Sequence, residues 1–235
     1  MARMSELISI AIETSCRVGG IALGRGDALR RVVTFDASMR HATHLVSRLR
    51  QLLLDEGLAP ADLRHAYVAA GPGSFTGLRV GITVARTLGQ LVGNLKLAAV
   101  PTTLAVAENV RDLAWENLGV ILDAREGLVY AERFTRRDGQ PAPAASPIVQ
   151  APAEFLAGSP RPLTLVGEGL GYHDLRADGV ELVPQELWLP TAAGVWQVGH
   201  RLAGQGRFVD FNHLLPIYTR PPAVLRARTV NSLTR

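Results

Sequence analysis

Cysteine and lysine are almost absent from this chain. Cys16 has no second cysteine to pair with, so an internal disulfide is excluded, and we expect it to be a buried small side chain rather than a nucleophile. Lys96 is the only lysine among 25 basic residues, and no dense basic run accompanies the net charge of +4. This pattern indicates a preference for arginine more than a nucleic-acid surface. A solvated end is favoured over an RNA-binding tail for the C-terminal arginines, which are Arg220, Arg226, Arg228 and Arg235.

Long apolar runs are missing as well. Residues 1–6 lack the basic start and apolar stretch of a signal peptide. The most apolar helical segment is interrupted by Arg79, Arg86 and Lys96, well short of the ~20 apolar residues that a membrane span requires. We therefore expect a cytoplasmic protein with no membrane partner. A hydrophobic content of 47% over 235 residues is enough for one large or two small buried cores.

The apolar pattern predicts an α/β protein. Runs at 7–12, 18–23 and 29–35 are separated by turns, so they predict an antiparallel meander. Helical spacing over 43–56 and 76–93 alternates with short strands at 66–70 and 96–100. Three meandering strands followed by helix, strand, helix and strand make a layer with a mixed sheet.

A second, smaller unit is expected from near Thr102. It begins with a helix over 103–113 and continues as a hairpin of 120–122 with 128–134. The proline-rich stretch 141–152 predicts a loop rather than a strand. Short strands at 163–166 and 180–183 and a last helix over 192–202 complete the prediction.

The densest motif is the glycine-rich loop at 71–81, which leaves a strand and opens a helix. Backbone N–H groups at such a helix start attract anions, so Gly71, Gly73, Ser74 and Thr76 are candidates for a phosphate cradle. No lysine follows the last glycine, and the spacing fits neither the dinucleotide fingerprint nor a nucleophile elbow. The sequence therefore predicts at most a vestigial phosphate loop with weak affinity for ATP or ADP, and no required cofactor.

The helix after this loop carries a row of small residues at every fourth position: Gly77, Gly81, Ala85, Gly89 and Gly93. Each glycine inside a helix costs roughly 1 kcal/mol relative to alanine, so the row needs a compensating reason. The row forms a groove that another element can enter at close range. Two interpretations follow: the groove packs on the protein's own sheet, or it faces a partner chain, which is the interpretation we favour.

Few residues are candidates for chemistry. His41 and His44 are three apart, which is half of a metal site at most, so no metal is predicted. Glu13, Asp123 and Glu126 are the carboxylates closest to predicted strand ends, where ligands bind in such sheets, but their spacing does not show that any two converge. No catalytic residue is predicted.

Four motifs together resemble the TsaB family, formerly YeaZ, over almost the whole chain. They are Ala11-Ile12-Glu13-Thr14-Ser15, the segment from Ala70 to Gly81, Leu122-Asp123-Ala124-Arg125 with Val129-Tyr130, and Pro216-Ile217-Tyr218-Thr219-Arg220. The resemblance implies an actin-like (ASKHA) α/β fold of two ribonuclease-H-like lobes with mixed sheets. The first lobe would cover 1–102, completed by 191–235, and the reduced second lobe would cover 103–190.

The resemblance also implies a function. Similar proteins are accessory, non-catalytic subunits in the formation of N6-threonylcarbamoyladenosine next to the tRNA anticodon. They pair with the catalytic subunit TsaD through first-lobe helices, can form a homodimer through the same helices, and are joined by the ATPase TsaE, so that contact with tRNA is indirect. TsaD carries a His-x-x-x-His metal motif, which this chain lacks. The expected partner interface consists of His41, Leu45, Leu49, Gly77, Gly81, Ala85 and Gly89.

Two other functions stay open from the residues. A small-molecule kinase or ATPase of the same fold would need two carboxylates converging on the loop at 71–77. A metallopeptidase would need a metal site.

Overall fold

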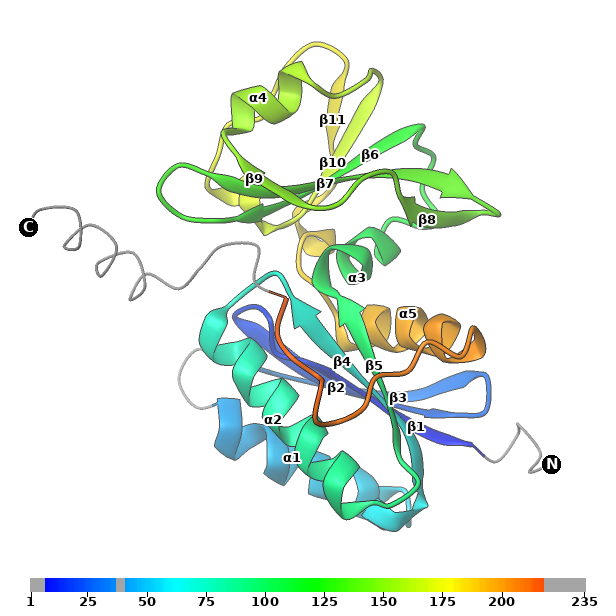
Figure 1. Ribbon diagram of the computed structural model, residues 1–235. Helices are drawn as coiled ribbons and strands as arrows, with labels where there is room; N and C mark the ends of the chain where they lie inside the picture. Colours follow the sequence, from blue (N-terminus) through cyan, green and yellow to red (C-terminus); the bar gives the residue numbers. More distant parts are fainter. Residues whose placement is uncertain (1–6, 37–40, 218–235) are drawn as a thin grey trace, which may run out of the picture.

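The computed structural model describes residues 7–36 and 41–217, with side chains described for 7–35 and 45–217. Two β-sheets, each with its own helices, lie one above the other in Figure 1. The first sheet has the strand order β3-β2-β1-β4-β5, and the main path of the second is β11-β10-β6-β7-β8.

The first sheet is mixed. β1 (Ile8–Glu13), β2 (Val18–Arg25) and β3 (Ala28–Asp36) form the expected antiparallel meander, and β4 (Leu63–Gly71) and β5 (Lys96–Pro101) run parallel to β1. All six residues of β1 are buried because helices cover both faces of the sheet. α1 (His41–Asp55) and α2 (Phe75–Leu91) pack on one face, and α5 (Ala192–Gly204) packs on the other.

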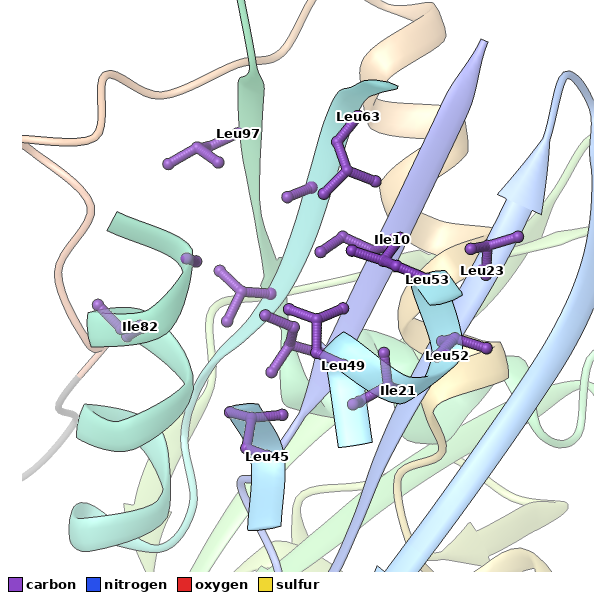
Figure 2. Packing of buried hydrophobic residues seen from close by; sticks show 14 of the residues in the cluster. Ile10, Ile21, Leu23, Leu45, Leu49, Leu52, Leu53, Leu63, Ile82 and Leu97 are labelled. Atoms are coloured by element: carbon purple, nitrogen blue, oxygen red, sulfur yellow. The ribbon is translucent and has the colours of Figure 1, made fainter. Parts of the chain in front are cut away.

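The helix α1 presents four leucines to the sheet. Leu45, Leu49, Leu52 and Leu53 recur at helical spacing and form one buried stripe, whereas Val46 and Leu54 are exposed. Figure 2 shows the side chains that meet in this core, among them Leu45 and Leu49 of α1, Ile10 of β1 and Ile82 of α2.

The second sheet is built on the expected hairpin, β6 (Asn117–Asp123) with β7 (Val129–Arg137). β10 (Leu163–Val166) and β11 (Val180–Leu182) extend it in parallel on the β6 side. Its helices are short, namely α3 (Thr102–Glu108) and α4 (Pro152–Ala157), with the 3-10 turns η3 (Glu168–Gly171) and η4 (Gln185–Leu187). A further 3-10 turn, η2 (Pro60–Asp62), precedes β4 in the first sheet.

The expectation of a loop over 141–152 is wrong. β8 (Gln140–Pro143) and β9 (Ile148–Gln150) both pair with β7, and α4 begins at Pro152. Neither strand has a second neighbour among the described residues, and proline is tolerated on edge strands because its missing N–H would have faced away from the ladder. The helix expected over 103–113 is also shorter, because α3 ends at Glu108.

Two helices tie the sheets together. The carboxylate of Glu108 on α3 accepts hydrogen bonds from both terminal nitrogens of Arg201 on α5, at 3.0 and 2.7 Å. The Nδ2 of Asn109 donates to the carbonyls of Leu187 and Leu189, in the segment that leads back to the first sheet. The strands of the first sheet lie within residues 8–101 and those of the second within 117–182, while the division into two domains at 102 and 191 stays a prediction.

The segment that follows α5 returns to the first sheet. We name residues 205–217 the strap. Val209 forms an antiparallel bridge with Leu97 of β5, Leu214 is buried in the first core, and the Ile217 N–H donates to the carbonyl of Ala70. In Figure 1 the strap passes beside α2 and β5.

Candidate functional site

The glycine-rich loop between β4 and α2 packs against its own chain. Gly71 and Gly73 have φ values of +114° and +155°. A Cβ on Gly71 would lie 2.6 Å from the carbonyl oxygen of Ile217, and one on Gly73 would lie 2.6 Å from that of Ser15. The two glycines therefore permit the close approach of the strap and of the β1–β2 turn.

Several backbone donors at the start of α2 already have partners. The Ser74 N–H donates to the carbonyl of Ser15 at 2.7 Å, and the Ser74 hydroxyl caps the helix by accepting from the Gly77 N–H at 3.3 Å. A phosphate on the expected cradle would compete with both bonds. Thr76, the remaining cradle candidate, instead lines a groove on the outer side of α2.

The row of small residues on α2 faces the protein's own sheet. A Cβ on Gly77 would collide with the Thr14 carbonyl, and one on Gly81 with the Thr14 side chain. A Cβ on Gly89 would lie 2.8 Å from the Cβ of Phe211 in the strap, and Ala85 is fully buried. The expectation that this row faces a partner is wrong, because the sheet and the strap fill the groove.

The expected interface residues of α1 need the same correction. Leu45 and Leu49 are buried in the first core, so they cannot contact a partner on the surface. The side chain of His41, like that of His44, lies outside the described side chains. Periodicity identified the apolar stripe of α1 correctly, but such a stripe normally forms the contact between a helix and its own sheet, so it does not indicate a partner surface.

The outer side of the α1–α2 pair carries an apolar groove of about 330 Å³. We name it the outer groove; its lining residues are Val46, Phe75, Thr76, Arg79, Val80, Thr83 and Val84. Val46 is 55% exposed and Phe75 is 43% exposed. The Arg79 guanidinium lies over the Phe75 ring, 5.0 Å from its centroid. Sequence reasoning named Thr76 for another role and missed the other lining residues, because the small-residue row was the stronger signal.

Glu13 is a buried acid at the end of β1, with 1% exposure. One of its carboxylate oxygens accepts from the Ser15 hydroxyl at 2.6 Å and from the Ser15 N–H. The other oxygen, Oε2, has no hydrogen-bond partner among the described residues. Burial raises the pKa of Glu13 to about 7; the hydrogen bonds from Ser15 oppose the rise, and the charge of Glu168 adds to it.

Asp123 and Glu168 occupy the second side of the same junction. Asp123 ends β6, accepts from the Arg125 N–H at 3.1 Å and pairs with His173 Nε2 at 3.3 Å. Burial, followed by the charge of Asp123, raises the pKa of Glu168 at the start of η3. The charge of Glu168 acts on Glu13, and the charge of Asp123 acts on Glu168. Two of the three candidate carboxylates are thus linked electrostatically by Glu168, which the sequence analysis missed.

A simple signal could have found Glu168. It stands two residues after the buried strand β10, so it is close to a strand end, as Glu13 and Asp123 are. Glu126, the third candidate, lies on the exposed turn between β6 and β7 with a φ of +54°.

The junction between the two sheets also contains a cavity of about 500 Å³, which we name the junction cavity. It is lined by Arg17, Glu168, Gly171, Tyr172, Gln185, Glu186, Trp188 and Leu189. Arg17 follows β1 in the first sheet, and the other lining residues come from η3, η4 and the segments beside them.

Cys16 is not a nucleophile in this structure. Its thiol donates to the carbonyl of Val18 at 3.2 Å, and its side chain is buried, as the sequence predicted. Burial, followed by the charge of Glu13, raises the pKa of Cys16 to about 12, so the thiolate is scarce at neutral pH. No group of three or more His, Cys, Asp or Glu residues within the described part of the chain is placed to hold a metal ion.

Curated relatives match nearly the whole chain. The Bacillus subtilis "tRNA threonylcarbamoyladenosine biosynthesis protein TsaB" is 32% identical over 90% of this chain and 93% of its own length. The Escherichia coli protein of the same name is 27% identical over 90% and 94%. This chain belongs to the TsaB family. The family model for TsaD, described as tRNA N6-adenosine threonylcarbamoyltransferase, matches residues 32–178, so TsaB and TsaD share much of this sequence pattern.

Solved structures share the fold. YeaZ from Pseudomonas aeruginosa superposes with a TM-score of 0.79 at 24% identity, covering 90% of this chain and 99% of that chain. A second structure from the same organism, described as similar to the peptidase YeaZ, has a TM-score of 0.80 over 91% and 100%. The expected α/β architecture of two mixed sheets is confirmed. Within the part of the chain that the structure describes, no helix is both long and apolar enough to cross a membrane.

Proposed function

We propose that this protein is a non-catalytic partner subunit for a TsaD-type transferase in the formation of N6-threonylcarbamoyladenosine on tRNA. The observation that carries the proposal is the outer groove on a helix pair that belongs to a TsaB protein. The partner surface that we propose is thus the outer side of α1 and α2, instead of the small-residue row first expected.

The composition of this surface supports docking of a protein. Four large apolar side chains on α1 and α2 are more than 40% exposed: Val46, Leu54, Phe75 and Leu91. Two of them, Val46 and Phe75, line the outer groove together, and an apolar groove with exposed large side chains is a feature of interaction sites. Arg79 adds a guanidinium stacked on Phe75, and arginine and aromatic residues are enriched among the residues that dominate binding energy.

The remaining parts of the proposal concern the chemistry and the assembly. The subunit supplies no catalytic group, and ATP or ADP binds it weakly, at or near the partner interface. The occupied donors of Ser74 and Gly77 support weak binding. A TsaE-type ATPase joins the same complex, contact with tRNA is indirect, and the free subunit forms a homodimer through the same helices.

The substitution Val46→Arg tests the proposed surface. An arginine at this exposed position should leave the melting temperature unchanged and weaken binding to the cognate TsaD-type protein by at least about tenfold, because it places a charge in the apolar groove. Isothermal titration calorimetry measures the affinity, and sedimentation follows the homodimer. Val32→Arg is the matched control, since Val32 is 41% exposed on β3 and should bind normally. Unchanged affinity of the Val46→Arg variant would refute the surface.

A kinase or ATPase of the same fold is the second candidate. The charge interaction between Glu13 and Glu168 favours it, since Ser15 donates to Glu13 and its carbonyl accepts from the Ser74 N–H of the glycine-rich loop. The occupied backbone donors of the loop count against it. ATP turnover by the purified subunit that is lost in Glu168→Gln would favour this function over the first. A metallopeptidase has no observation in its favour among the described residues.

A further inference from the structure

The junction cavity is lined by both aromatic and acidic side chains. Tyr172 and Trp188 supply aromatic rings, and Glu168 and Glu186 supply carboxylates. The Trp188 Nε1–H donates to the carbonyl of Val183 at 2.8 Å, so the indole is held in one orientation. Tyr172 also lines the cavity and is 62% exposed, so its ring is accessible from solvent.

The carboxylate of Glu168 in the cavity wall lacks a partner among the described residues. Glu168 makes no hydrogen bond or ion pair with any residue that the structure describes. Glu13, whose pKa the charge of Glu168 raises, is fully buried and does not line the cavity. Glu168 is half-buried at the cavity wall, so a ligand that supplies positive charge or N–H donors gives its carboxylate the partner that it lacks within the described chain.

Arg17 is the one cationic side chain that lines the cavity among the residues that the structure describes, and it gives Glu168 no hydrogen bond. Arg17 is exposed, and its charge acts on Glu168 without a hydrogen bond. The rise in the pKa of Glu168 persists despite Arg17 and Arg125, since burial and Asp123 outweigh them. Two carboxylates, those of Glu168 and Glu186, therefore line the cavity with a single described arginine.

We infer that the junction cavity binds a small organic cation through a guanidinium group. A flat guanidinium can stack on an aromatic ring and donate two parallel N–H bonds to a carboxylate, which matches the Trp188 and Tyr172 rings beside Glu168. A nucleotide phosphate would be repelled by the same carboxylates. Direct coordination of a metal ion has no support, because no three candidate ligands in the described chain lie close enough together. This inference does not depend on the proposed role as a partner subunit.

Agmatine is the probe for this site. Titration of the full chain with agmatine should release or absorb heat in calorimetry and change tryptophan fluorescence, since Trp188 lines the cavity. Glu168→Gln should weaken binding by at least about tenfold, because the neutral amide loses the charge-assisted bonds. Glu181→Gln, on the exposed side of β11, is the matched control and should bind as the unchanged protein does.

Two further arms keep the test decisive. Tyr172→Ala removes an exposed ring, so it should stay folded and bind agmatine more weakly, which covers the case in which Glu168→Gln is unstable. The site is overturned if millimolar agmatine gives no more signal than sodium chloride at equal ionic strength. It is also overturned if the Tyr172→Ala and Glu168→Gln variants bind agmatine as tightly as the unchanged protein does. Tighter binding of ATP than of agmatine in this cavity would overturn it as well.

Discussion

Glu13 ends β1 with its carboxylate almost wholly out of water. Its pKa lies near 7 in the folded protein against 4.5 for an unperturbed glutamate, so the folded state holds the proton more tightly than the unfolded state. Stability then falls as pH rises from 4.5 through about 7, because the unfolded chain releases the proton first. Glu132 on β7 is a second acid of this kind, since burial raises its pKa to about 7 as well.

The substitution Glu13→Gln removes the contribution of Glu13 to the pH dependence of stability. The variant should gain about 1 to 3 kcal/mol relative to the unchanged protein between pH 5 and pH 8, since a neutral amide has no charge to bury. Urea unfolding at the two pH values measures the gain, with Glu181→Gln as the exposed control. Parallel pH dependence of the Glu13→Gln variant and the unchanged protein would show that Glu13 does not titrate in this range.

Residue-level chemistry was only partly predictable from the sequence. Cys16 could be assigned to the interior because a lone cysteine without a legible base has no other common role. The meeting of Glu13 with Glu168 could not, since the two acids are 155 positions apart and only the packing of two sheets brings them together. The sequence also could not show which backbone N–H groups of the glycine-rich loop already have partners. The carbonyl of Ser15, which is distant in sequence, accepts from one of them, the Ser74 N–H.

At the scale of elements, α2 shows what periodicity can establish. The sequence predicted a helix over 76–93, and the structure has it at Phe75–Leu91. The spacing also showed that its small residues share one face. It could not show which neighbour that face meets, since Thr14 of the β1–β2 turn and Phe211 of the strap are distant in sequence. Strands β8 and β9 were missed because proline usually argues against strands and only edge pairing permits it.

The substitution Gly81→Ala tests the packing of α2. Alanine is the better helix former by about 1 kcal/mol, yet its Cβ would collide with the Thr14 side chain, whose hydroxyl donates to the Gly77 carbonyl at 2.8 Å. We expect a net loss of about 1 to 3 kcal/mol in the free energy of unfolding, measured by urea denaturation. Gly93→Ala is the control, because a Cβ there meets nothing within 4 Å. Equal stability of the two variants would place the row outside the core.

At the scale of the whole molecule, the strap covers part of the first core through the side chain of Leu214. Leu214 is 1% exposed in that core, whereas its neighbour Leu215 is 63% exposed. Leu214→Ala should therefore cost about 2 to 5 kcal/mol of unfolding free energy, because it leaves a cavity between the strap and the sheet. Leu215→Ala should change it by less than about 0.5 kcal/mol. Thermal unfolding of both variants distinguishes them, and similar melting temperatures would mean that the strap contributes no packing.

The position of α5 and the strap along the chain has a consequence for synthesis on the ribosome. The strands of the first sheet are complete at residue 101, but the helix that covers their second face begins only at residue 192. At 5 to 20 residues per second, roughly 5 to 20 s of translation separate the two. During that time the second sheet, whose strands lie between 117 and 182, can form from consecutive segments. The half of the protein that is translated first is thus the half that closes last, and a chain released before residue 192 leaves one face of its first sheet uncovered.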